Sequence, residues 1–214
     1  MHFTKLSFDD FMTKVSELLG ISISNPQIVE AVGRFGYNMQ RLREGDSAFR
    51  KVQQLHAAQE DAMKRKVSAH DERKKLHASV RKQYMKMLQI ARIAFDGDSL
   101  VRKALQLDGP RETSLDKWIN QVALFGNRLI TEEQWAAALK DYGISISLIH
   151  ALMNDVENLR SIALMCDQTK EDAKKQTALK KEKLKALQDW ISDYLKIAKI
   201  ALDDHPNLYQ QLKV

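Results

Sequence analysis

Three histidines in the first half of the chain have the residue type and spacing that metal or acid–base chemistry would need. His56, His70 and His77 are separated by multiples of seven residues, which places them on one face of a helix. His56 and Glu60 lie one helical turn apart and could face the same ion. Di-iron sites in helical bundles, however, need two Glu-x-x-His pairs, and the sequence contains none. The positions 107 residues later hold no metal ligand either; they are Ala163, Thr177 and Leu184. We therefore interpret the histidines as surface or half-buried residues of a helix and expect no cofactor.

Other reactive residue types are sparse. The single cysteine, Cys166, falls on an apolar heptad position and is interpreted as a small buried residue. Because one thiol cannot form an intramolecular disulfide, nothing indicates an oxidising compartment. The acidic clusters at 96–98 and 203–205 hold too few ligands for a calcium loop and are typical of helix ends. No phosphate-binding glycine loop, nucleophile elbow or H-E-x-x-H pattern is present, so the sequence favours a protein that is not an enzyme.

The elements that would position these residues occur twice. Residues 90–96 (IARIAFD) match residues 197–203 (IAKIALD) at an offset of 107, and the 214-residue chain is twice that length. At the same offset the apolar pattern stays in register along the chain. The matched pairs include Phe8/Leu115, Phe11/Trp118, Met12/Ile119, Val15/Val122, Leu42/Ile149, Phe49/Val156, Val52/Leu159 and Leu55/Ile162. We interpret the chain as two tandem repeats, 1–107 and 108–214, that fold together as one structural unit.

These motifs resemble an uncharacterised family of bacterial all-helical proteins with two tandem repeats of about 107 residues. In that family each repeat has a glycine turn that opens a long helix and an I-A-R/K-I-A segment that closes it. Gly36-Tyr37 and Gly143-Ile144 match the turn, and 90–95 and 197–202 match the closing segment. The resemblance implies an all-α fold and no known activity.

Capping residues predict where the helices of one repeat begin and end. Ser7 followed by two aspartates, Asn25 before a proline, and Asn38 are helix starts. Gly20 and Gly36 are expected to stop the first and second helices. Short helices at about 100–107 and 208–212 are expected to follow the two long ones.

The third helix of each repeat is expected to be long, because 46–96 and 145–205 contain no glycine and no proline. A helix from 38 to 95 would measure about 85 Å. Two all-α architectures fit this pattern. In the favoured one, two continuous helices form an elongated antiparallel coiled coil or bundle. In the alternative, breaks near 67–71 and 174–178 give hairpins and a compact four-helix bundle.

The aromatic residues predict where the cores lie. All fifteen Phe, Trp and Tyr residues fall outside 50–83 and 157–189. Since aromatic side chains supply much of a core's buried area, we expect cores at the ends of the long helices and thin, solvated middles. Charge follows the opposite distribution. Residues 60–82 carry a net charge of +4 and residues 167–189 a net charge of +2, which together equal the whole net charge of +6.

These observations favour a non-enzymatic protein that interacts with a protein partner or with itself, or acts as a scaffold. The alternative is a module that binds nucleic acid or another polyanion through the basic middle of the long helices. Its candidate residues are Lys64, Arg65, Lys66, Lys74, Lys75, Lys174, Lys175, Lys180 and Lys181. No apolar run approaches the ~20 residues of a membrane span, so we expect no membrane association and a cytoplasmic location.

Overall fold

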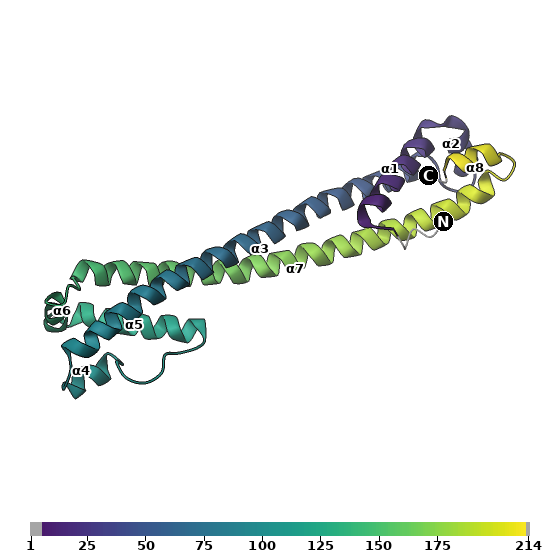
Figure 1. Ribbon diagram of the computed structural model, residues 1–214. Coiled ribbons are helices and arrows are strands. Elements are labelled where there is room, and N and C mark those ends of the chain that lie inside the picture. The colour runs from purple at the N-terminus through teal and green to yellow at the C-terminus, as the bar shows by residue number, and fades with distance from the viewer. Residues whose placement is uncertain (1–5, 213–214) are drawn as a thin grey trace. The chain divides into compact units, whose positions relative to one another are not determined.

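The computed structural model describes residues 6–212, which form eight α-helices and no strand (Figure 1). The helices are α1 (Phe8–Ser24), α2 (Pro26–Gly33), α3 (Met39–Ala94), α4 (Ser99–Ala104), α5 (Leu115–Thr131), α6 (Glu133–Lys140), α7 (Ile146–Ala201) and α8 (Pro206–Gln211). Every helix from α5 to α8 begins and ends 107 residues after its counterpart among α1 to α4. The all-α fold expected from the sequence is therefore confirmed.

The predicted helix starts are confirmed by their hydrogen bonds. Ser7 Oγ accepts from the Asp10 N–H at 3.2 Å, and Asn25 Oδ1 accepts from the Gln27 N–H at 3.0 Å. Asn38 caps α3 in the same way. Side-chain acceptors of this kind satisfy N–H groups that the first helical turn leaves unpaired.

One predicted helix end is wrong. Helix α1 does not stop at Gly20 but continues to Ser24, four residues later. The core-facing positions continue through Leu19 and Ser22, both buried, so packing outweighs the weak helix propensity of one glycine. Gly36 does close a turn after α2, with a φ of 88° that only glycine adopts readily.

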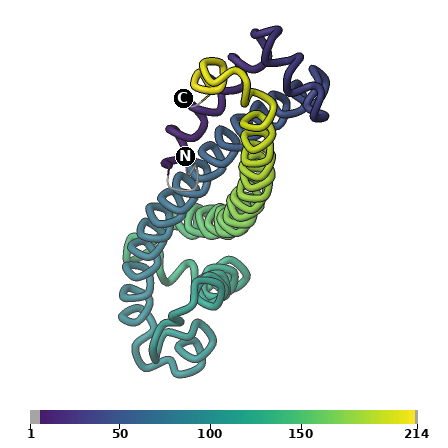
Figure 2. The backbone as a smooth tube through the Cα atoms, turned by 90° about the vertical axis from the view of Figure 1, so that its right-hand side faces the viewer, coloured from purple at the N-terminus to yellow at the C-terminus, as the bar shows by residue number. Residues whose placement is uncertain are grey.

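The long helices α3 and α7 are each continuous over 56 residues. In Figure 2 each can be followed as an unbroken coil. The alternative architecture with breaks near 67–71 and 174–178 is therefore wrong. Without a glycine, a proline or turn chemistry in these stretches, nothing in the backbone interrupts the hydrogen-bond ladder.

The described chain divides into two compact units, and each draws on both halves of the sequence. The first unit contains residues up to Met63 and from Asp172 onward; the second is Lys64–Glu171. In the first unit, α1, α2 and α8 gather around the start of α3 and the end of α7 (Figure 1). Its core includes Phe11, Leu18, Ile28, Val32, Tyr37, Leu42, Phe49, Val52, Leu187, Ile191, Tyr194, Ala198, Leu202 and Leu212.

The second unit repeats this plan with the roles of the long helices exchanged. Here α4, α5 and α6 pack against the end of α3 and the start of α7. Its core includes Val80, Tyr84, Met87, Leu88, Phe95, Leu105, Leu107, Trp118, Ile119, Val122, Phe125, Leu129, Leu139, Ile149, Leu152, Val156 and Leu159. The predicted repeats 1–107 and 108–214 describe a sequence pattern, and their boundary does not coincide with that of either unit.

Outside the two core clusters, the long helices bury Leu55 and otherwise only small side chains. Ala62 and Ala173 are buried in the first unit, and Ala69 and Cys166 in the second. The Cys166 thiol donates to the Ala69 carbonyl oxygen at 3.2 Å. The prediction that the aromatic cores lie near the ends of the long helices is thus confirmed within each unit. Among residues 6–212, no helix is long and apolar enough to cross a membrane.

Candidate functional site

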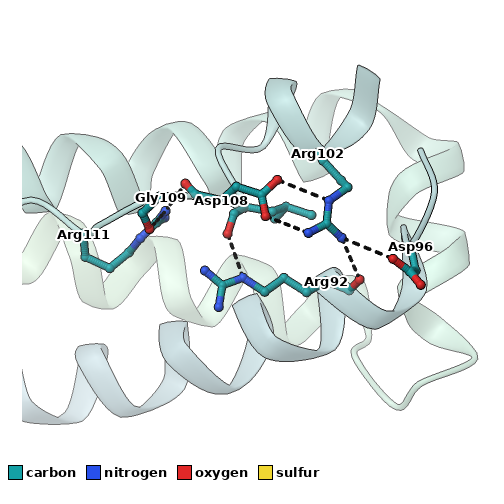
Figure 3. Close-up of polar contacts among 7 residues, drawn as sticks. Arg92, Asp96, Arg102, Asp108, Gly109 and Arg111 are labelled. Atoms are coloured by element: carbon teal, nitrogen blue, oxygen red, sulfur yellow. Dashed lines mark hydrogen bonds and ion pairs between the residues drawn. The ribbon is translucent and has the colours of Figure 1, made fainter. Parts of the chain in front are cut away.

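The segment that joins α4 to α5 is fixed by arginines (Figure 3). Arg92 on α3 donates from Nε to the Leu107 carbonyl oxygen at 2.7 Å. Arg102 on α4 forms a two-pronged pair with Asp108, at 2.6 and 3.2 Å, and also donates to the Arg92 carbonyl oxygen at 3.1 Å. The hydrogen bond from Arg102 lowers the pKa of the Asp108 carboxyl, and the charges of Arg102, Arg92 and Arg111 lower it further. Arginine suits this role because its planar guanidinium can donate in several directions at once.

Arg111, at the end of this segment, is held by three hydrogen bonds. Nη1 donates to the Tyr84 hydroxyl oxygen at 2.7 Å, and Nη2 donates to the carbonyl oxygens of Asp108 and Gly109 at 2.8 and 3.1 Å. Its Nε is buried and has no hydrogen-bond partner among the described residues. Tyr84 is itself fully buried and packs edge-on against Trp118. The guanidinium is therefore anchored to the core, and two of its five N–H groups are not committed to the protein.

A recess of about 520 Å³ opens in the second unit beside Arg111. It lies between the surface of α3 and the start of α5, and its lining is predominantly cationic. The lining residues are His70, Arg73, Lys74, His77, Arg81, Met85, Arg111, Glu112, Thr113, Leu115 and Trp118. Four permanent cations thus face a single carboxylate. Within the described chain, Arg73, Lys74 and Arg81 form no salt bridge.

The pKa of His77 is affected by the positive charges around this recess. Its ring packs edge-on against Trp118 with 4.7 Å between centroids. Burial lowers the pKa of His77, and the positive charges of Arg81 and Arg73 lower it further. A nearby carboxylate would act in the opposite direction. The lining therefore carries an excess of positive charge, with four permanent cations and one carboxylate.

The start of α5 borders the same recess through Thr113 and Leu115. Ser114 occupies the N-cap position but accepts no side-chain hydrogen bond from the helix, unlike its counterpart Ser7 in α1. The N-terminus of a helix carries a partial positive charge and unpaired N–H groups, both of which favour an anion. The start of α5 thus adds to the positive field of the side chains.

The corresponding region of the first unit is built differently. Lys180, the counterpart of Arg73, lies over the Phe8 ring at 4.0 Å and hydrogen bonds to His56 Nδ1 at 2.8 Å. Burial lowers the pKa of Lys180, while Glu60 and Asp9 act against that shift. This lysine is engaged by protein groups, whereas Arg73 and Lys74 are not.

The structure separates the nine basic residues predicted from the sequence. Lys74 lines the recess, and Lys180 packs on Phe8 as described above. The remaining residues lie elsewhere on the long helices: Lys64, Arg65, Lys66 and Lys75 in the second unit, and Lys174, Lys175 and Lys181 in the first. Sequence reasoning missed Arg73, Arg81 and Arg111 as members of one site. The first two resemble ordinary solvated cations, and Arg111 lies in a connecting segment without a periodic pattern.

The three histidines do not come together as a metal site. His70 is exposed beside Asp71, and His56 Nε2 lies 3.7 Å from Glu60 Oε1. No group of three or more potential His, Cys, Asp or Glu metal ligands occurs within residues 6–212. The only residues of this kind in the recess lining are His70, His77 and Glu112.

No family model, curated protein or solved structure matches this chain. The residues themselves therefore carry the functional argument. The recess lining is dominated by cationic groups, with one carboxylate, so it offers binding groups for an anion.

Proposed function

We propose that this chain is a non-enzymatic interaction or scaffolding protein. The supporting observation is the large helical surface that the cores leave unused. Along the middle of α3 and α7 in the second unit, Val67, Leu164 and Met165 expose 56%, 62% and 48% of their surface. Partner helices bind through apolar faces of this kind, whose burial on association provides the driving force.

Site-specific photo-crosslinking tests this proposal. A photoreactive residue replaces Leu164 in cells that naturally produce the chain, and a matched control replaces the exposed, polar Lys185 on the same helix. We expect a defined protein partner, or a second copy of the chain, to be crosslinked at 164 and not at 185. Turnover of a small substrate that a single substitution abolishes would contradict the proposal.

A second candidate function is polyanion binding, which the cationic recess of the second unit favours. Such binding should weaken steeply with salt, because each neutralised phosphate releases counterions. Charge reversal at Lys64, Arg65 and Lys181 should then weaken the binding of duplex DNA in a fluorescence anisotropy titration at low salt. Unchanged affinity in that variant would contradict a role for these helix middles.

A further inference from the structure

We propose that the recess of the second unit binds the phosphate groups of a compact oligophosphate through its four cationic side chains. This inference rests on the second candidate function and deepens it, because it names one site and one class of ligand. The ligand chemistry is a short chain of phosphates, either free or esterified in a nucleoside triphosphate.

Charge and shape both support this ligand class. Four permanent cations and one carboxylate line a recess of about 520 Å³, a volume within the usual range of small-molecule sites. A single carboxylate ligand would leave most of that positive charge unneutralised, whereas a short phosphate chain carries several negative charges. Guanidinium groups also match phosphate oxygens in geometry, and three of the four cations are arginines.

The site is partly organised before any ligand arrives. Tyr84 and the carbonyl oxygens of Asp108 and Gly109 fix the Arg111 guanidinium. A side chain held in this way loses little freedom on binding, which favours affinity. Trp118 is only 4% exposed and packs edge-on against His77. Because the indole is buried, it has no open face on which a base could stack. The recess is therefore suited to phosphates rather than to stacked bases.

Calorimetric titration with inorganic tripolyphosphate tests the proposal on the full chain. The site variant is R73Q/K74Q, which removes two cations from the recess. The matched control is K185Q/K199Q, which removes the same charge from exposed positions of α7 in the first unit. Far-UV circular dichroism verifies that both variants keep the helical content of the parent chain.

We expect the site variant to bind tripolyphosphate about tenfold or more weakly, since each charge-assisted hydrogen bond contributes strongly. The control should change affinity less than about twofold, because neither of its lysines lines the recess. A nucleoside triphosphate titrated in parallel identifies the source of the phosphates: equal affinity indicates that the phosphate chain alone is recognised, and tighter binding adds the nucleoside.

Two results would overturn the inference. Equal losses in the site variant and the control would mean that diffuse charge, not the recess, attracts the anion. Absence of tripolyphosphate binding would also overturn it. Duplex DNA binding measured on the same samples separates the two levels: if DNA still binds, polyanion binding stands as a function while the recess fails as an oligophosphate site.

Discussion

Replacing Gly45 with alanine tests the packing of the first unit directly. Gly45 lies inside α3, and a Cβ built on it would meet three ring atoms of Trp190 at 2.5–2.7 Å. Trp190 has little room to move, since it stacks on Tyr194 at 5.4 Å between centroids and meets Tyr37 edge-on at 5.6 Å. The glycine is therefore required by the close approach of an aromatic ring and not by its backbone freedom.

Two opposing effects set the expected magnitude. Alanine in place of glycine within a helix stabilises the folded chain by roughly 0.8–1 kcal/mol. Overpacking a filled region costs about 1–3 kcal/mol. Gly20 in α1 provides the control, because a Cβ there meets nothing within 4 Å. The propensity gain is common to both sites, so the difference between G45A and G20A isolates the overpacking cost.

Urea denaturation followed by circular dichroism at 222 nm measures the comparison. We expect G20A to be more stable than the parent chain, and G45A to fall below G20A by about 1–3 kcal/mol in free energy of unfolding. Equal stabilisation by the two substitutions would refute the reasoning, because it would mean that Trp190 does not lie against Gly45.

Three further predictions follow from the buried polar contacts and the shared cores. Tyr194→Phe removes a buried 2.6 Å hydrogen bond to Ser22 and should lower stability by about 1 kcal/mol in urea denaturation. Burial raises the pKa of Tyr194 to about 12, above its ordinary value of 10.0. The stability that the protonated hydroxyl contributes is therefore complete below pH 10 and is lost as the pH rises from 10 towards 12. The free energy of unfolding should fall less steeply across that pH range in the phenylalanine variant. Arg111→Gln breaks the ties to Tyr84 and the connecting segment, and hydrogen exchange should become faster at residues 107–113 with little change in α1. Each core contains residues from both halves of the chain, so 1–107 and 108–214 produced as separate chains should associate when mixed. Two fully helical halves that both remain monomeric in sedimentation velocity after mixing would contradict the shared cores.

Most of the fold is predictable because it depends on local chemistry. Asn25, Asn38 and Ser7 mark helix starts by a mechanism that needs no tertiary contact. The continuity of α3 and α7 follows from the absence of breakers, and the location of the cores follows from the aromatic residues. The helix end expected at Gly20 is wrong because the low helix propensity of one glycine is outweighed by the packing of Leu19 and Ser22.

The candidate site was harder to predict because its members share no local pattern. Arg73 and Arg81 lie on α3, whereas Arg111 belongs to a segment that other arginines hold in place. The neighbourhood of Arg111 depends on the Tyr84 hydroxyl, and the position 107 residues after Tyr84 is an isoleucine, Ile191. A comparison of the two halves by apolar pattern treats these two positions as equivalent. It therefore does not reveal the Tyr84 hydroxyl that holds Arg111.

The two units use different residues at several packing positions that correspond by the offset of 107. In the first unit Gly45 faces Trp190, and the counterparts of this pair in the second unit are Leu152 and Gln83. A small residue against a large one in the first unit thus corresponds to two residues of intermediate size in the second.

The polar pair of Ser22 and Tyr194 corresponds in the same way to the apolar pair of Leu129 and Met87, all four of which are buried. In each pair, one residue comes from a short helix or from the start of a long helix, and the other lies near the end of the other long helix. Both residues differ between the two units. Because each core joins both halves of the chain, residues from one half constrain residues from the other. Packing therefore couples residues that are far apart in the sequence, such as Gly45 with Trp190 and Ser22 with Tyr194. An identity count between the halves cannot detect this constraint, whereas a double-mutant cycle on either pair can.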